Sequence, residues 1–206
     1  MRKAVAHLKK ADPVMARIIR QVGPYRIEYS PPDYSTIARC IVYQQLSGKA
    51  AARIYRRLGA ALPGGRVTPE AVLGTNDEKL RELGLSRQKI AYLKDFAQAV
   101  AAGEIDLDAL RRAPDEEVMR ALTSRKGIGP WTVHMYLIFA LRRPDVLPVG
   151  DLGIRVAVQR AYGFDELPAP AEVERVGRPW RPYASVASWY LWRSLGDGAG
   201  LDPVVD

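Results

Sequence analysis

Cysteine is nearly absent from this chain of 206 residues. The single cysteine, Cys40, cannot form a disulfide within the chain or supply a four-cysteine zinc or iron–sulfur site. Histidine is also scarce, and neither His7 nor His134 has partners at metal-ligand spacing. The sequence therefore excludes a disulfide framework and a cysteine-only metal cluster, and Cys40 is expected to be a small core residue.

Long apolar runs and strand patterns are missing as well. No apolar run reaches the ~18 residues that a membrane-spanning helix needs, and the N-terminus lacks the apolar stretch of a secretory signal. Few windows alternate apolar and polar residues with β-branched enrichment. We therefore expect a cytoplasmic protein with no segment inserted in a membrane, and an all-α fold of about ten short helices.

Basic residues are in excess. The chain has 31 Lys and Arg against 23 Asp and Glu, which gives a net charge of +8. Such a charge favours a polyanionic partner, either nucleic acid or an anionic membrane surface, and charge alone does not choose between them. The length favours one compact unit with two lobes over two large independent domains. We expect the protein to be a monomer.

Helix-starting signals recur along the chain. Asp12 followed by Pro13 predicts an N-cap and first turn. Thr75, with Glu78 three residues later, predicts a capping box for a short helix. Ser86 predicts the start of a longer helix.

The most informative window is residues 122–133. It lies within a pattern over about residues 115–142 that predicts a helix, a Gly-x-Gly hairpin and a second helix. Gly127 and Gly129 permit positive φ and close backbone approach, and Pro130 suits a first helical turn. The amides that begin the second helix could bind a phosphate. Spacing alone leaves a plain tight turn equally open, whereas the basic composition and adjacent Arg125 and Lys126 favour DNA.

Four segments together resemble a known family. They are YQQLS at 43–47, KGIGPWT at 126–132, LPVGDLGI at 147–154 and PWRPYAS at 179–185. In this order they resemble the helix-hairpin-helix DNA glycosylases of base excision repair, and within them the 3-methyladenine DNA glycosylase II branch. The resemblance spans about residues 35–195. It implies a single glycosylase domain over 1–206 with two helical lobes, without the additional N-terminal β domain of larger members.

The resemblance places the family's catalytic aspartate on Asp151. Cleavage of an N-glycosidic bond builds positive charge on the sugar, which a fixed carboxylate can stabilise while it orients water. Taken by itself, an aspartate that opens a helix is ordinarily an N-cap. Many relatives carry a further aspartate where this chain has Gly150.

The resemblance also implies which reactions are absent. Members that cleave the DNA strand use a hairpin lysine as nucleophile, and that position matches Trp131 here. We therefore expect a monofunctional enzyme without lyase activity, without an iron–sulfur cluster and without any cofactor for catalysis.

Aromatic side chains are the candidates for a base pocket, since an everted base stacks on them and a cationic base is attracted further. The resemblance assigns Trp131 and Trp189 to this pocket, with Met135 one turn after Trp131 and with Tyr43 as a further candidate. Trp189 could equally be a core residue. Trp180 and Trp192 are interpreted as core.

The same resemblance assigns the DNA contacts. Gln44, Gln45 and Leu46 fall where the family places the side chain that fills the gap left by the flipped base, although solvent-facing polar residues beside one core anchor would have the same pattern. The remaining candidates are the phosphate contacts Gly127, Gly129, Trp131, Arg125, Lys126 and Lys49, and a monovalent ion (Na or K) on the backbone carbonyls of Thr123, Arg125 and Ile128.

Three functions stay open at this point. The leading hypothesis is a DNA glycosylase that hydrolyses 3-methyladenine and other alkylated bases from double-stranded DNA, located with the nucleoid if the cell is prokaryotic. One rival is a non-catalytic helix-hairpin-helix protein that binds DNA, with Asp151 only a cap. The other is a glycosylase for other damaged bases.

Overall fold

The computed structural model describes residues 1–196, and helices make up all of their regular secondary structure. Within this range there are thirteen α-helices and no β-strand, which confirms the predicted all-α fold. The number exceeds the expected ten because several helices are very short; α8 (Leu107–Leu110) has four residues. None of the described helices is both long enough and apolar enough to span a bilayer.

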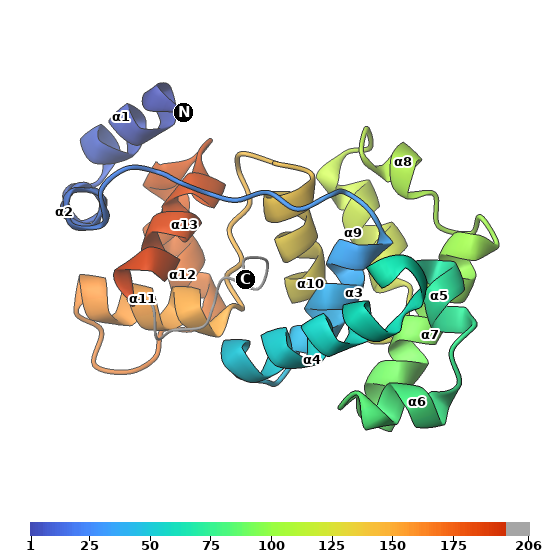
Figure 1. The fold of residues 1–206 in the computed structure, drawn as a ribbon. Helices are drawn as coiled ribbons and strands as arrows, with labels where there is room; N and C mark the ends of the chain where they lie inside the picture. Colours follow the sequence, from blue (N-terminus) through green and yellow to red (C-terminus); the bar gives the residue numbers. More distant parts are fainter. Residues whose placement is uncertain (197–206) are drawn as a thin grey trace. The chain divides into compact units, whose positions relative to one another are not determined.

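The chain divides into two compact units, in keeping with the two helical lobes expected from the sequence. Unit 1 combines residues 1–28 with residues 142–196, and unit 2 is residues 29–141. Unit 1 contains α1 (Arg2–Ala11), α2 (Pro13–Val22), α11 (Leu152–Tyr162), α12 (Pro170–Gly177), η3 (Arg178–Trp180) and α13 (Ala184–Ser194) (Figure 1). Unit 2 contains α3 (Tyr34–Tyr43), α4 (Gly48–Ala61), η1 (Pro63–Gly65), α5 (Pro69–Leu73), α6 (Asp77–Glu82), α7 (Arg87–Ala101), α8, α9 (Asp115–Thr123), α10 (Pro130–Met135) and the π-helical turn η2 (Tyr136–Ala140) (Figure 1).

Unit 1 is built around α13, which packs against α2 and α11. Beside them lies a buried polar junction at Asp12, whose side chain is only 6% exposed. The Asp12 carboxylate accepts hydrogen bonds from the hydroxyl of Tyr162 at 2.5 Å and from the indole nitrogen of Trp180 at 2.9 Å. Trp180 is fully buried, as the sequence predicted. A single carboxylate thus joins the start of α2, the end of α11 and η3.

Unit 2 is built around α7, which packs against α3, α5 and α6. The rings of Tyr34 and Phe96 stack with their centroids 5.3 Å apart in the core between α3 and α7. Cys40 on α3 is completely buried, and this burial raises the pKa of its thiol to about 12. The prediction that Cys40 is a core residue is confirmed.

Two of the three predicted helix starts are confirmed. Asp12 caps α2 by accepting from the amide of Val14 at 2.8 Å, and Ser86 caps α7. The predicted capping box of Thr75 and Glu78 is wrong. The Thr75 hydroxyl instead donates to the Ala71 carbonyl in the last turn of α5, and the side chain of Asn76 caps α6. Thr75 and Asn76 are adjacent and both can cap a helix, but the side chain of Thr75 is already hydrogen-bonded to the preceding helix.

Candidate functional site

The hairpin between α9 and α10 has the predicted helix, turn, helix form. Gly127 has a φ of +80°, and a Cβ at this position would stand 2.1 Å from the ring of Tyr92. Gly129 differs from the prediction, because its φ of −96° is ordinary extended backbone and no atom lies within 4 Å of the place of its Cβ. Gly127 is therefore required by the fold of unit 2, whereas Gly129 leaves an open approach to the amides that begin α10.

The guanidinium of Arg125 is paired with two acidic side chains. Its Nε and Nη2 atoms each donate to an oxygen of Asp95 at 3.1 Å, and its Nη1 atom donates to Glu104 at 3.1 Å. These contacts attach the hairpin to α7 and to the turn after it, and they argue against the predicted phosphate role. Lys126 and Lys49, the other two basic candidates, are exposed.

The three intercalation candidates differ from one another. The amide nitrogen of Gln44 donates to the carbonyl of Gly127 at 2.7 Å and to the hydroxyl of Thr132 at 3.2 Å. Gln45 is exposed and has a φ of +57°, and Leu46 is 41% exposed. The structure therefore commits Gln44 to the hairpin and leaves Gln45 and Leu46 as the accessible side chains of this turn.

A cavity of about 510 Å³ lies beside the hairpin within unit 2. Lys89 reaches into its wall from α7, where its ammonium donates to the carbonyl of Val42 at 2.5 Å, and burial lowers the pKa of this lysine. The lining residues are Gln44, Gln45, Gln88, Lys89, Tyr92, Thr123, Arg125, Gly127, Ile128 and Gly129. The three residues predicted to offer carbonyls to a monovalent ion are among them.

Side-chain metal ligands are not grouped anywhere in residues 1–196, where no three His, Cys, Asp or Glu side chains could share a metal ion. An ion at the hairpin would therefore depend on carbonyl oxygens. His134 lies on α10 with its side chain half-buried, and burial lowers the pKa of its imidazole.

Asp151 belongs to unit 1 and opens α11. Its side chain is 3% exposed, and its Oδ1 atom accepts from the amide of Ile154 at 2.8 Å. The same oxygen accepts from the indole nitrogen of Trp192 at 2.9 Å. Asp151 is thus a helix cap, as its position alone indicates, and it is also held by a tryptophan from α13. The interpretation of Trp192 as core only is incomplete, since its ring is buried but its N–H serves this carboxylate.

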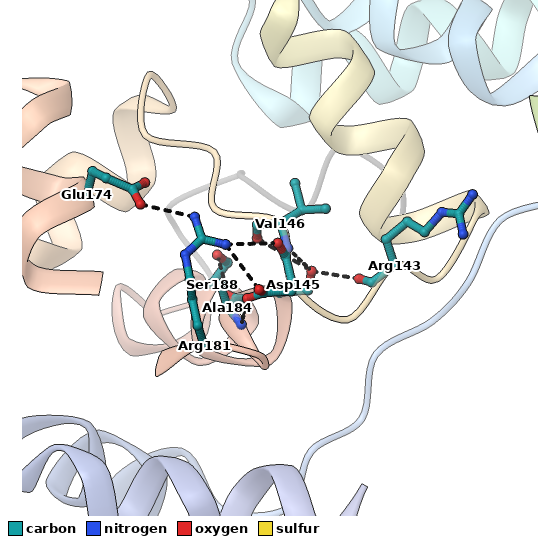
Figure 2. A network of polar contacts seen from close by, with 8 residues as sticks. Arg143, Asp145, Val146, Glu174, Arg181, Ala184 and Ser188 are labelled. Atoms are coloured by element: carbon teal, nitrogen blue, oxygen red, sulfur yellow. Dashed lines mark hydrogen bonds and ion pairs between the residues drawn. The ribbon is translucent and has the colours of Figure 1, made fainter. Parts of the chain in front are cut away.

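A polar network in unit 1 fixes the segment that leads to Asp151 against the start of α13 (Figure 2). Arg181 donates to Asp145 at 3.1 Å and to Glu174 at 3.0 Å, and hydrogen bonding to Glu174 raises the pKa of Arg181. The hydroxyl of Ser185 accepts from the amide of Val146 at 2.9 Å. These contacts fix the segment that leads to α11, whose N-cap is Asp151, against the start of α13, which carries Trp192.

The four aromatic and sulfur candidates for a base pocket come from both units. In unit 1, Trp189 is 4% exposed, its ring meets Tyr25 edge-on at 4.7 Å, and its indole nitrogen has no hydrogen-bond partner among the described residues. In unit 2, Trp131 is half-buried, Met135 is completely buried and Tyr43 is 6% exposed. Trp131 has the most accessible surface of the four.

These features, a glycine hairpin and a buried aspartate held at a helix start, lie in a stretch that matches a known family. Residues 38–182 match the model of the HhH-GPD superfamily base excision DNA repair proteins. The chain belongs to this superfamily. The matched range contains the hairpin and Asp151, and Trp189 and Trp192 lie beyond it.

Individual members of the superfamily are similar over most of the chain. DNA-3-methyladenine glycosylase 1 of Schizosaccharomyces pombe is 36% identical over 198 residues, which cover 93% of this chain and 86% of that protein. A putative DNA-3-methyladenine glycosylase of Bacillus subtilis is 34% identical, and the match covers 84% of this chain but 61% of that longer protein.

Solved structures of superfamily members have the same fold. The structure of a Schizosaccharomyces pombe 3-methyladenine DNA glycosylase in complex with abasic DNA aligns with a TM-score of 0.87 at 36% identity, covering 92% of this chain and 95% of that one. A DNA-3-methyladenine glycosidase of Bacillus halodurans aligns with a TM-score of 0.80 at 34% identity, covering 94% and 89%. The HhH-GPD fold expected from the four sequence segments is confirmed.

Proposed function

We propose that the protein is a monofunctional DNA glycosylase that hydrolyses alkylated bases such as 3-methyladenine from double-stranded DNA. The observation that carries the proposal is the buried Asp151 carboxylate, which two N–H donors hold at the start of α11. The substrate class is supported by the names of the Schizosaccharomyces pombe and Bacillus relatives. Such an enzyme would act as a monomer on DNA in the cytoplasm, and with the nucleoid if the cell is prokaryotic.

Asp151 would act on the sugar of the flipped nucleotide. As the bond between the base and C1′ breaks, positive charge develops on the sugar ring, and a fixed carboxylate stabilises that charge and orients the attacking water. The amide of Ile154 and the indole of Trp192 both donate to Oδ1, so they keep the carboxylate in one orientation without reorganisation during the reaction. The base leaves with its electron pair, and water supplies the hydroxyl group that remains on C1′.

Residues of the hairpin and the turn at 44–46 would hold the DNA. The open face at Gly129 and the exposed side chains of Lys126 and Lys49 suit phosphate contacts. Gln45 and Leu46 are the accessible side chains that could fill the gap in the duplex. Backbone carbonyls of Thr123, Arg125 and Ile128 beside the same cavity could bind a monovalent cation.

The aromatic candidates would bind the flipped base. Trp131 offers an electron-rich face that attracts a cationic purine. The ring of Trp189 is buried with the Arg193 guanidinium 5.7 Å from its centroid, and its indole nitrogen, which has no hydrogen-bond partner among the described residues, could donate to a base. Met135 is completely buried, and Tyr43 and Trp189 are nearly so, so a direct contact with the base would require these three side chains to become accessible. Trp131 also occupies the position of the strand-cleaving lysine, which supports release of the base with an intact strand.

The test is release of free base from duplex DNA that contains 3-methyladenine, by the purified protein and by Asp151→Asn, with strand integrity followed separately. We expect wild-type protein to release the base without nicking the strand. Asp151→Asn should slow release by about 100-fold or more, because it removes the negative charge but keeps an oxygen for the Ile154 and Trp192 donors.

Asp106→Asn is the matched control, because Asp106 also caps a helix, accepting from the amide of Ala109 at 3.0 Å, but is exposed. It should leave release unchanged. If Asp151→Asn releases the base as fast as the wild-type protein, Asp151 serves only as a helix cap. If wild-type protein binds the DNA and releases no base, the protein is a binding module or acts on other lesions.

A further inference from the structure

We propose that Gln44 is a positioning residue that joins the DNA-inserting turn at residues 44–46 to the phosphate-binding hairpin, so that the two act as one rigid part of unit 2. The proposal rests on the proposed glycosylase function, in which both elements contact DNA. Its starting point is that Gln44 stands in a motif expected to insert into DNA, but its amide already donates two hydrogen bonds inside the protein.

The two acceptors are at the two ends of the turn that carries the phosphate-binding amides. The Gly127 carbonyl lies in the hairpin itself, and the Thr132 hydroxyl lies in the first turn of α10. Thr132 is 1% exposed. One side chain from the end of α3 therefore spans the segment from Gly127 to Thr132, where it fixes the turn and the helix start relative to each other.

The position of Gly127 is fixed from another direction as well. The ring of Tyr92 on α7 occupies the space that a side chain at Gly127 would need. With Tyr92 against its Cα atom and Gln44 on its carbonyl, this peptide is held between two elements that are remote from it in sequence.

The inserting turn is held in a similar way. Lys89 on α7 donates to the Val42 carbonyl in the last turn of α3, directly before the turn. Directly after Gln44, Gln45 has a φ of +57°, a left-handed conformation that residues other than glycine adopt rarely and keep only where their surroundings enforce it. The Leu46 amide donates to the Tyr43 carbonyl at 3.3 Å across this turn, and Lys89 and Gln44 hold the residues on its N-terminal side.

The chemistry of the amide makes the role testable. Gln44→Glu keeps the size of the side chain but replaces the donating nitrogen with an acceptor, which then faces the Gly127 carbonyl oxygen. Gln98→Glu is the matched control, because Gln98 lies exposed on α7 in the same unit and the substitution adds the same negative charge. The difference between the two variants isolates the contact from the charge.

Three measurements are made on the full-length wild-type protein and on both variants. They are the single-turnover rate of 3-methyladenine release, the fluorescence of 2-aminopurine placed beside the lesion as a report of base extrusion, and hydrogen exchange of the amides of residues 127–132 without DNA. A misplaced inserting turn should slow release by about 10- to 100-fold in Gln44→Glu relative to Gln98→Glu. The extrusion signal should fall, and exchange at 127–132 should become faster.

Equal rates, equal extrusion signals and equal exchange in the two variants would overturn the proposal. Hydrogen exchange decides the coupling even if wild-type protein releases no base, which separates failure of this proposal from failure of the proposed function. If Gln44→Glu does not fold, Thr132→Val and Thr132→Ser replace it, since only serine keeps the hydroxyl that accepts from Gln44. Slower release by the valine variant alone supports the coupling, and equal behaviour of the pair overturns it.

Discussion

At the scale of single residues, the contact between Trp192 and Asp151 is the most informative feature of unit 1. The indole nitrogen donates to the carboxylate at 2.9 Å, and both side chains are buried. A hydrogen bond to a charged group in such surroundings is stronger than one between neutral groups, and losing it leaves the carboxylate less well oriented. Trp192 therefore acts on the proposed chemistry through Asp151.

Trp192→Phe tests this role. Phenylalanine keeps the aromatic bulk and removes the N–H, so we expect base release to slow by about 10- to 100-fold, as for the loss of about 1.5–3 kcal/mol of hydrogen bonding to a charged group. Single-turnover release and the circular dichroism spectrum are measured together. A rate equal to that of wild type, with the fold retained, would leave Trp192 a packing residue.

At the scale of elements, the two hairpin glycines have different physical roles. Gly127 combines a positive φ with the ring of Tyr92 at the place of a side chain, whereas Gly129 has neither constraint. The element needs the first glycine for its own fold, and the second glycine leaves space for a ligand. Neither role follows from the Gly-x-Gly spacing, because the two positions look alike in the sequence.

Gly127→Ala and Gly129→Ala should separate stability from binding. We expect Gly127→Ala to lower the free energy of unfolding by about 2 kcal/mol or more, from the clash with Tyr92 and the left-handed backbone. Gly129→Ala should change it by less than about 0.5 kcal/mol but weaken DNA binding, because its methyl group would stand in the approach to the amides. Urea unfolding and DNA titration measure the two effects. Equal losses of stability would contradict this division.

At the scale of the whole molecule, the net charge of +8 favours a polyanion such as DNA, and the number of phosphates that basic side chains contact sets how binding responds to salt. Neutralised phosphates release bound counterions, so affinity falls as salt rises, with a logarithmic slope of about −0.9 for each phosphate contact. The basic side chains do not contribute equally to this salt dependence. Arg125 is already neutralised by Asp95 and Glu104, whereas Lys126 is exposed.

Lys126→Gln should make the salt dependence of binding less steep by about one phosphate contact. The control is Lys79→Gln, since Lys79 pairs with Glu82 at 3.2 Å on α6; this variant should keep the wild-type slope. Binding to undamaged duplex DNA at several salt concentrations gives the slopes. A slope for Lys126→Gln equal to that of wild type would remove Lys126 from the DNA contacts.

The sequence by itself determined the helical class, two of the three predicted helix starts and the hairpin, because these depend on residues within about four positions of one another. The cap at Asp12 and the glycine turn before Pro130 are of this kind. The start at Thr75 was predicted one residue too early, since two adjacent residues could each cap. The scarcity of cysteine likewise excluded a four-cysteine cluster, because one thiol cannot supply four ligands however the chain folds.

Only the tertiary structure decided the partners of the functional side chains. Gln44 bonds to Gly127 across 83 positions, Trp192 to Asp151 across 41, and Arg125 to Asp95 across 30. Each of these side chains has a plausible local interpretation, as intercalator, core residue or phosphate ligand, and the structure changes or extends all three. The physical reason is that a hydrogen-bonding group takes its partner from whatever packing brings within about 3 Å, and packing is a property of the folded chain.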